Sequence, residues 1–153
     1  MPGNARKIID AARTAYQRGV RLLITPELAI CGYAAEDLFL RPSFIAACQE
    51  AVALVQTELA PLLGMHVVVG HPSGDDKRTR SVAVQQRFNM ASVFCEGQCI
   101  ASYAKRELPN YQVFDERRYF TPGHSTCVFD VGGWRVGLLI CEDAWFEAPA
   151  ADA

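Results

Sequence analysis

The sequence predicts an α/β fold in which helices pack against a mixed β-sheet. Two segments near the start of the chain place apolar residues at helical spacing, and each is followed by a short apolar run typical of a buried strand. Farther along, the period of the apolar residues changes, and residues 87–104 and 126–140 are typical of two hairpins. Helices early and hairpins late favour a sheet with both parallel and antiparallel strands.

The first half of the chain supplies the expected helices. Asn4 is suited to begin a helix, Gly19 is suited to end it, and Pro26 stops the strand that follows. The elements expected here are a helix from Asn4 to about Arg18, a strand from Val20 to Thr25, a helical turn from Asp37 to Leu40, a helix from Ser43 to about Leu59 and a strand from Met65 to Gly70.

The second half supplies the expected hairpins, after a polar loop at residues 74–78. The Gly-Gly turn of the second hairpin suits the positive φ angles of a tight turn. Residues 148–153 are expected to be a frayed end. The segments expected to pair are 87–95 with 98–104 about Glu96-Gly97-Gln98, and 126–131 with 134–140 about Gly132-Gly133.

Length and charge exclude several classes of protein. At 153 residues the chain is long enough for one domain with a real core. A net charge of −2 gives no electrostatic footprint for nucleic acid or an anionic membrane, so neither is expected as a partner. The longest apolar runs fall far short of the roughly 20 residues that span a bilayer, and no secretory leader is visible.

The cysteines and histidines show no spacing typical of a metal site, so no metal is expected. Most of the six cysteines lie in apolar stretches, where a cysteine is usually a small core residue. Cys95 and Cys99 flank the first hairpin turn, and a disulfide between them is conceivable. A reducing, cytoplasmic setting is the better expectation.

Three reactive residues each follow an apolar strand. Glu27 comes after the first strand, Lys105 after the first hairpin, and Cys141 after the last apolar run. Alone, each has an ordinary interpretation: a solvated acid, a surface lysine and a cysteine that fills the core. Ligand sites in α/β sheets concentrate at strand ends, so the three together predict one site at a sheet edge.

These side chains suit cleavage of an amide. A thiolate attacks a carbonyl carbon well, and a nearby carboxylate can take the thiol proton and then return one to the departing amine. The ammonium of Lys105 and a backbone N–H, most simply that of Glu142, would stabilise the negative oxygen of the tetrahedral intermediate. Lys105 is therefore more useful as a fixed positive charge than as a base.

Several segments carry a resemblance to a known family. They are Pro26-Glu27-Leu28-Ala29 with Gly32-Tyr33 and Glu36-Asp37-Leu38, Lys105 with Leu108-Pro109-Asn110-Tyr111, the Phe-Asp-Glu-Arg-Arg-Tyr-Phe stretch at 114–120, and Ile140-Cys141-Glu142-Asp143. Through them the chain resembles the nitrilase (carbon–nitrogen hydrolase) superfamily with its Glu-Lys-Cys triad. The likeness is strongest to the glutamine amidotransferase domain of glutamine-dependent NAD synthetases, and it covers nearly the whole chain.

The resemblance implies a nitrilase-like α-β-β-α sandwich and a glutaminase. Glu27 would be the general base and acid, Lys105 the oxyanion stabiliser, and Cys141 the nucleophile that forms a γ-glutamyl thioester, which water hydrolyses to glutamate. Tyr111 would line the glutamine pocket, and Glu116 would be a second carboxylate that holds the lysine. Their ordinary alternatives are an exposed tyrosine in a turn and a surface acid. In the family, ammonia passes through a tunnel to a synthetase domain that uses ATP and magnesium to amidate nicotinic acid adenine dinucleotide.

Set beside that family, residues 1–153 are expected to be a partial hydrolase domain that lacks the synthetase domain, because no Ser-Gly-Gly-x-Asp-Ser-type loop is present. The family has a strand before Gly3-Asn4 and further strands and helices after the nucleophile. An unfinished sheet exposes edge groups and apolar surface, so marginal stability and homo-oligomers are expected. No cofactor is expected in this domain, and glutamine and a synthetase domain, in cis or in trans, are the expected partners.

Three functions stay open from the sequence. The first is the glutaminase part of an NAD synthetase. The second is another nitrilase-like amidase or a carbamoylase, against which the loop at 108–111 argues. The third is a non-catalytic fragment that folds only with a partner chain.

Overall fold

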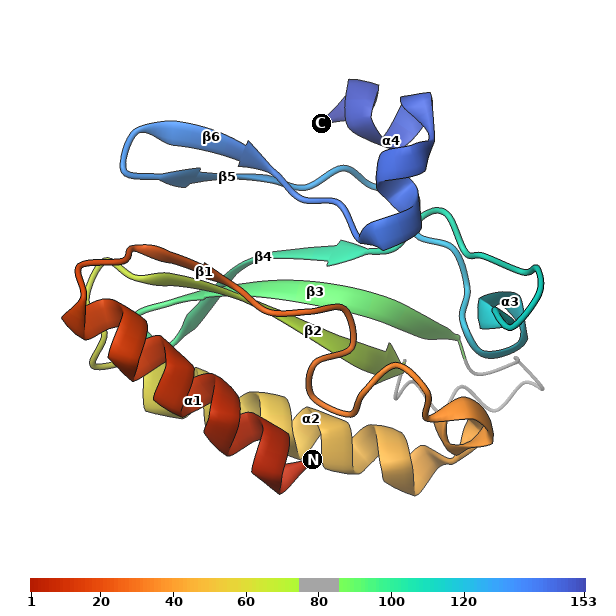
Figure 1. Ribbon diagram of the computed structural model, residues 1–153, viewed down its shortest axis with the longest axis horizontal. Helices are drawn as coiled ribbons and strands as arrows, with labels where there is room; N and C mark the ends of the chain where they lie inside the picture. Colours follow the sequence, from red (N-terminus) through yellow and green to blue (C-terminus); the bar gives the residue numbers. More distant parts are fainter. Residues whose placement is uncertain (75–85) are drawn as a thin grey trace, which may run out of the picture.

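The computed structural model describes residues 1–74 and 86–153. Figure 1 shows three layers, which are two long helices, a four-stranded sheet above them and a two-stranded hairpin over the opposite face of that sheet. In the larger sheet, one pair of neighbouring strands is parallel and the other two pairs are antiparallel. The predicted α/β class with a mixed sheet, two helices and two hairpins is therefore confirmed.

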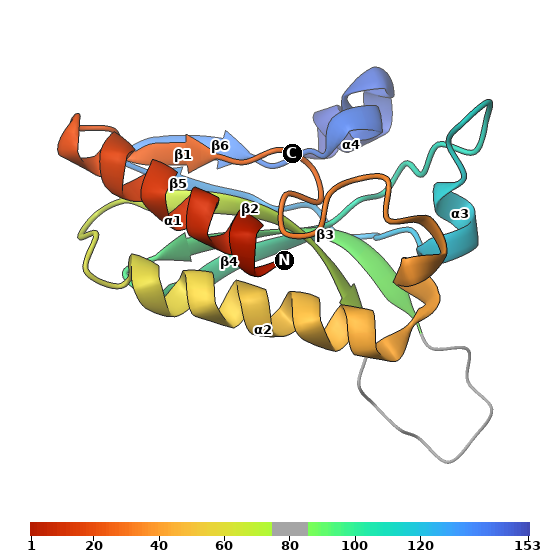
Figure 2. The same cartoon turned by 60° about the horizontal axis from the view of Figure 1, so that its bottom comes forward.

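The two helices pack against the sheet through apolar stripes. α1 (Pro2–Gln17) and α2 (Pro42–Leu59) each bury residues three or four positions apart, which is the spacing of one helical face. Figure 2 shows them side by side on the near side of the sheet. Within the described part of the chain, no helix combines the length and the apolar character needed to cross a bilayer. The core between helices and sheet includes Ile8, Ala12, Cys48, Val55, Val67, Val69 and Phe94.

The start of α1 differs from the prediction, and its end does not. Asn4 does not cap the helix, because Pro2 begins it earlier with a fixed φ angle and no N–H to satisfy. The Asn4 side chain instead donates to the backbone oxygen of Ile30 at 3.2 Å. Gly19 ends the helix as predicted: its φ of +82° turns the chain so that the N–H of Val20 donates back to the oxygen of Ala15 at 3.0 Å.

The larger sheet carries the parts of the chain that lead into the candidate site. A 3₁₀ helix, η1 (Glu36–Leu40), stands at the predicted helical turn between the first strand and α2. The predicted polar loop at 74–78 lies, apart from Gly74, outside the described residues. In hydrogen-bonded order, the strands are β1 (Leu22–Ile24), β2 (His66–Gly74), β3 (Arg87–Cys95) and β4 (Gln98–Ala104).

The second hairpin covers the face of this sheet that the helices leave free (Figure 1). β5 (Val128–Val131) and β6 (Trp134–Gly137) turn at Gly132 and Gly133, whose φ angles of +55° and +87° confirm the predicted tight turn. Apolar side chains fill the space between the sheets and form a second core. Its members are Val68, Ala91, Val93, Tyr103, Cys127, Phe129, Leu138 and Ile140.

The strand expected to lead to Cys141 ends earlier than predicted. β6 stops at Gly137, and its residues are mostly exposed, so Cys141 does not close a buried strand. The chain continues irregularly to η2 (Cys141–Trp145) because the Asp143 side chain accepts a hydrogen bond from the N–H of Ile140 at 3.0 Å. The backbone N–H of Ile140 thus bonds a carboxylate in the next turn and not the backbone of a neighbouring strand.

The C-terminal residues are helical, and the predicted frayed end at 148–153 is wrong. α4 (Glu147–Asp152) buries Pro149, and the Asp152 carboxylate accepts a hydrogen bond from Arg106 at 2.8 Å. A short helix, α3 (Glu116–Tyr119), was also missing from the prediction, because four residues are too few to show a helical period.

The cysteines form no disulfide in the described residues. All six are free thiols. The register of the first hairpin sets Cys99 opposite Phe94 and Cys95 opposite Gln98, so the conceivable Cys95–Cys99 bond is not made.

Candidate active site

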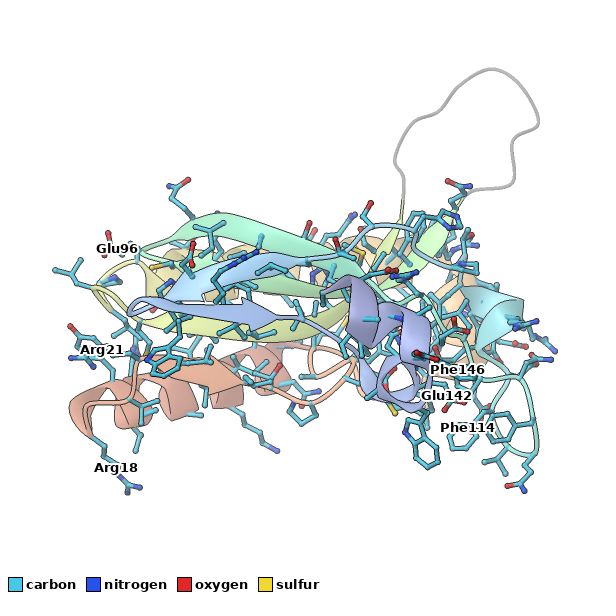
Figure 3. All side chains as sticks on the ribbon, turned by 90° about the horizontal axis from the view of Figure 1, so that it is seen from above. Arg18, Arg21, Glu96, Phe114, Glu142 and Phe146 are labelled. Carbon is cyan, nitrogen blue, oxygen red and sulfur yellow. The ribbon has the colours of Figure 1, made fainter. Side chains whose placement is uncertain are left out.

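The candidate residues gather at one end of the molecule, where segments from both sheets meet. Figure 3 places Glu142 and Phe114 at this end and Arg18 at the opposite one. Two loops and two short helices bring the side chains together. Glu27 lies in the loop after β1, Lys105 directly after β4, Glu116 at the start of α3 and Cys141 at the start of η2.

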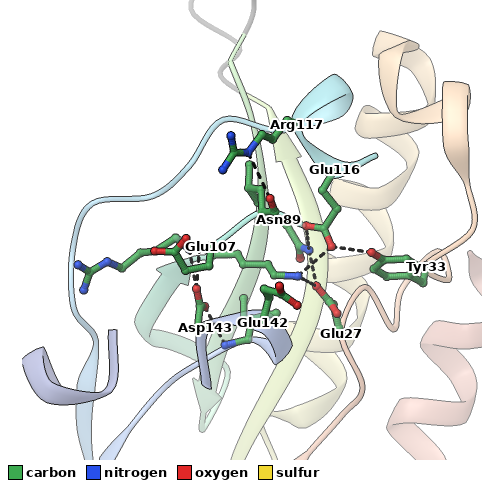
Figure 4. Close-up of polar contacts among 12 residues, drawn as sticks. Glu27, Tyr33, Asn89, Glu107, Glu116, Arg117, Glu142 and Asp143 are labelled. Atoms are coloured by element: carbon green, nitrogen blue, oxygen red, sulfur yellow. Dashed lines mark hydrogen bonds and ion pairs between the residues drawn. The ribbon is translucent and has the colours of Figure 1, made fainter. Parts of the chain in front are cut away.

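Lys105 is the centre of a buried ionic cluster, and Figure 4 labels its two acidic partners, Glu27 and Glu116. Its side chain is 0% exposed, and its Nζ donates to Glu27 Oε1 at 2.6 Å and to Glu116 Oε1 at 2.8 Å. Burial alone would lower the pKa of Lys105, but hydrogen bonds and charges from Glu116 and Glu27 outweigh it and raise the pKa. Lys105 therefore stays an ammonium at neutral pH and does not serve as a base.

Backbone contacts fix the place of Lys105. Its N–H donates to the oxygen of Asn89 on β3 at 2.8 Å, and its own oxygen accepts from the N–H of Gly123 at 2.8 Å. A Cβ at Gly123 would collide with the oxygen of Ala104 and lie 2.8 Å from its carbonyl carbon. Only glycine lets the chain approach the end of β4 this closely.

The loop that carries Glu27 lies against the backbone of β2. A Cβ at Gly70 would meet the oxygen of Pro26 and would lie 2.7 Å from the nitrogen of Leu28, so the strand and the loop touch here without a side chain between them. The oxygen of Gly70 accepts from the N–H of Ile30 at 3.1 Å, and the Thr25 hydroxyl accepts from the N–H of Gly70 at 3.1 Å. Bonds on either side of Glu27 thus hold its loop in place.

Cys141 opens onto a cavity that it shares with Glu27. The cavity has a volume of about 310 Å³, and its wall includes Met90 and Leu139. Burial and then the charge of Glu27 raise the pKa of the Cys141 thiol, while the charge of Lys105 acts in the opposite direction. Cys141 is therefore a protonated thiol at neutral pH and needs a base before it can attack a carbonyl carbon.

This raised pKa predicts how alkylation of Cys141 depends on pH. The thiolate fraction grows only as pH rises through the raised pKa, so the rate of alkylation by iodoacetamide should reach half its maximum above about pH 8.5, the pKa of an unperturbed thiol. Peptide mass spectrometry separates Cys141 from the other cysteines. A wild-type midpoint at or below the unperturbed value would contradict the prediction.

Asp143 ties the turn of Cys141 to the segment after Lys105. Its side chain is fully buried, and Oδ2 accepts hydrogen bonds from the Tyr103 hydroxyl at 2.9 Å and from the N–H of Ile140 at 3.0 Å. Its second oxygen, Oδ1, accepts from the backbone N–H groups of Arg106 at 3.1 Å and Glu107 at 2.8 Å. One carboxylate thus joins the two segments that carry the thiol and the ammonium.

The structure places Tyr111 beside the cluster and not within it. Its side chain is 48% exposed, and its hydroxyl donates to the two carboxylate oxygens of Glu142 at 3.2 and 3.1 Å. Both residues border a separate cavity of about 240 Å³ that also touches Asn110 and Arg117. Glu142 directly follows Cys141 in the chain, although Cys141 itself lines the other cavity.

Sequence reasoning missed two members of the cluster. The Asn89 amide donates to Glu27 Oε1 at 2.7 Å and to Glu116 Oε2 at 3.4 Å (Figure 4). The Tyr33 hydroxyl donates to Glu116 Oε1 at 2.7 Å. Asn89 had one visible signal, which is a polar residue between the apolar Phe88 and Met90 of a strand. Within residues 1–74 and 86–153, no group of three or more metal-binding side chains could hold a metal ion.

Comparison with protein families gives a match over almost the whole chain. The model of the carbon-nitrogen hydrolase family matches residues 1–152. The glutamine-dependent NAD(+) synthetase of Xylella fastidiosa (strain Temecula1 / ATCC 700964) is 47% identical over 152 residues, which are 97% of this chain and 26% of that protein. The chain thus spans about a quarter of the length of the curated relatives it matches. The predicted resemblance is confirmed.

Solved structures give the same result for the fold. The structure of glutamine-dependent NAD+ synthetase from Acinetobacter baumannii in complex with ADP matches with a TM-score of 0.84 and 36% identity, over 97% of this chain and 26% of that chain. An amidase from Nesterenkonia sp. matches with a TM-score of 0.78 and 26% identity, over 100% of this chain and 55% of that chain. The predicted nitrilase-like architecture is therefore confirmed.

Proposed function

The chain belongs to the carbon–nitrogen hydrolase family, and from this premise we propose that it hydrolyses the side-chain amide of glutamine. One observation carries the proposal: a buried lysine joins two carboxylates, and one of these carboxylates shares a cavity with an exposed thiol. These are the groups that amide cleavage needs, which are a nucleophile, a base and a fixed positive charge. The roles of the individual residues are part of the proposal.

The first half of the reaction forms a thioester. Glu27 takes the proton of the Cys141 thiol, and the sulfur attacks the carbon of the amide. The carbonyl oxygen becomes negative and is stabilised by Lys105, whose ammonium has three donors and spends two of them on carboxylates. The backbone N–H of Glu142 is a second donor to this oxygen. When the C–N bond breaks, Glu27 returns the proton to the nitrogen, and ammonia leaves.

The second half regenerates the thiol. Glu27 takes a proton from a water molecule, whose oxygen attacks the thioester carbon, and the C–S bond breaks as glutamate forms. The sulfur then recovers the proton from Glu27. Glu116 keeps the ammonium of Lys105 in place through both halves by its hydrogen bond of 2.8 Å. The proposed reaction needs no metal and no cofactor.

A specific feature favours glutamine over a simpler amide. The carboxylate of Glu142 lies beside Cys141 in the chain and is oriented by the Tyr111 hydroxyl. A carboxylate in this place suits the α-ammonium group of an amino acid. Tyr111 and Glu142 are thus proposed to line the glutamine pocket.

The proposed use of the ammonia follows from the relatives. Several are glutamine-dependent NAD(+) synthetases, so we propose that a synthetase domain, in cis or in trans, receives the ammonia made here. We also propose that copies of the chain associate and that they act in the reducing cytoplasm. The alternative of a simpler amidase is favoured by the similarity to the Nesterenkonia amidase. A fragment that is inactive without a partner chain is the other alternative.

The test of the proposed function is glutamate release from glutamine by the purified protein. Wild type should release glutamate, and Cys141→Ala should release none above the uncatalysed background, because the thioester cannot form. Propionamide serves as the competing substrate, and circular dichroism shows that each sample is folded. Turnover of propionamide but not glutamine would replace the proposal by the simpler amidase. A folded wild type that hydrolyses neither would support the inactive fragment.

A further inference from the structure

Asn89 is buried among the charged groups of the candidate site but carries no charge itself. It lies on β3, is 1% exposed and has its amide nitrogen within hydrogen-bond distance of Glu27 and Glu116. Two carboxylates offer only acceptors, so the amino group of the amide must face them and the carbonyl oxygen must point away. The surroundings thus fix the orientation of the amide.

The two donors at Glu27 meet the same oxygen. Asn89 Nδ2 is 2.7 Å from Glu27 Oε1, and Lys105 Nζ is 2.6 Å from it. One donor comes from β3 and the other from the residue after β4, so the carboxylate cannot rotate about its terminal bond without losing both hydrogen bonds. The other oxygen, Oε2, is then available in a fixed direction.

The Asn89 side chain carries a free-energy cost to folding that apolar packing does not explain. Its Oδ1 is buried and has no hydrogen-bond partner within the described residues. A buried polar atom without a partner costs about 1–3 kcal/mol, and an apolar side chain would avoid this. The hydrogen bonds from the amide nitrogen to the two carboxylates must therefore offset the free-energy cost of the unpaired Oδ1.

We propose that Asn89 is a positioning residue that, together with Lys105, fixes Glu27 Oε1 so that Oε2 is the oxygen that takes the Cys141 proton. In this step the S–H bond breaks, an O–H bond forms at Oε2, and the sulfur keeps the electron pair. A neutral amide suits this task, because it orients the carboxylate without adding a second positive charge beside the lysine. The inference rests on the proposed thiol chemistry of Cys141 but does not depend on glutamine as the substrate.

A double-mutant cycle tests this role without any substrate. The measurement is the rate constant for alkylation of Cys141 by iodoacetamide at pH 7, followed by peptide mass spectrometry. Asn89→Leu removes the donor, and we expect it to slow alkylation by about 10-fold in the wild-type background, because the base is no longer aimed at the thiol. In the Glu27→Gln background, where no carboxylate remains to be oriented, the same substitution should change the rate less than about 2-fold.

Two further variants keep the test decisive. Asn89→Ser covers the case in which leucine prevents folding, since its hydroxyl is polar but too short to reach both carboxylates. Ser92→Ala is the matched control. Ser92 lies on β3, like Asn89, and the substitution removes its buried hydrogen bond of 2.8 Å to His71 on β2, which should leave alkylation unchanged. If Asn89→Leu or Asn89→Ser slows alkylation equally in both Glu27 backgrounds, or in neither, the positioning role is overturned.

Hydrolysis of glutamine separates this inference from the proposed function. If Asn89 positions the base, Asn89→Leu should lower kcat by about 10-fold and leave KM unchanged, because the binding groups are elsewhere. Coupling in the alkylation cycle without any glutamine hydrolysis would sustain the role of Asn89 and reject glutamine as the substrate. Hydrolysis of glutamine with no coupling in the alkylation cycle would support glutamine as the substrate and overturn the positioning role of Asn89.

Discussion

Replacement of Lys105 by methionine is expected to abolish hydrolysis and to cost about 3–5 kcal/mol of unfolding free energy. The methionine keeps the length of the side chain but removes the charge, and the carboxylates of Glu27 and Glu116 then face one another without a counter-ion. Removing one partner of a buried ion pair leaves an uncompensated charge, and this accounts for the large penalty. The loss of the oxyanion donor alone should lower kcat on the order of 10²–10³-fold.

Urea denaturation and steady-state kinetics measure the two effects of Lys105→Met. The matched control is Arg13→Met, which removes an ion pair of 2.6 Å to Glu58 on the surface, where both side chains are about half exposed. It should change stability by less than about 1 kcal/mol. The double variant Lys105→Met/Glu116→Gln should recover part of the stability but none of the activity. A Lys105→Met protein as stable as the control would show that the cluster is not effectively buried.

Replacement of Asp143 by alanine is expected to be nearly as harmful. The carboxylate accepts four hydrogen bonds in a fully buried site, and alanine would leave three backbone N–H groups and the Tyr103 hydroxyl without a partner. Each unsatisfied group costs about 1–3 kcal/mol, so a loss of about 3 kcal/mol or more is expected even when some donors find water. Activity should fall on the order of 10²-fold, because the segments that hold Cys141 and Lys105 lose their link.

Thermal or urea denaturation and glutamate release measure the outcome of Asp143→Ala. Asp130→Ala on β5 is the control, because it removes an exposed carboxylate from the hairpin that precedes η2. It should change stability by less than about 0.5 kcal/mol. Asp143→Asn should also be destabilised, since its amino group would face N–H donors on one side. Full activity and stability in Asp143→Ala would refute the linking role.

The sequence predicted the elements that have a clear period and missed those that depend on single contacts. The helices and the first hairpin were visible because their apolar residues repeat at the spacing of one buried face. The end of β6 was not, since it depends on the Asp143 side chain, which reaches back to Ile140. α4 was missed because six residues rich in alanine, ending in an ion pair with Arg106, show no amphipathic pattern.

The candidate site follows the same division. The convergence of Glu27 and Lys105 was predictable from strand ends, although the residues are 78 positions apart. The place of Asn89 in the site was not predictable. One polar residue in a strand indicates a buried polar group, but it does not indicate which residues that group contacts. Tyr111 was expected in the substrate pocket, and the structure sets it against Glu142. The catalytic and binding roles of all these residues stay predictions until the experiments above are done.

The backbone of Cys141 has a consequence for how such a protein evolves. Its φ of +47° lies in the left-handed region, which costs a residue other than glycine of order 1 kcal/mol or more. Under the proposed mechanism, selection for folding and selection for chemistry therefore disagree at this position, since glycine suits the conformation and the proposed reaction needs the thiol. If Cys141 has the proposed role, a duplicated copy that no longer needs the thiol can replace it with glycine and keep its fold.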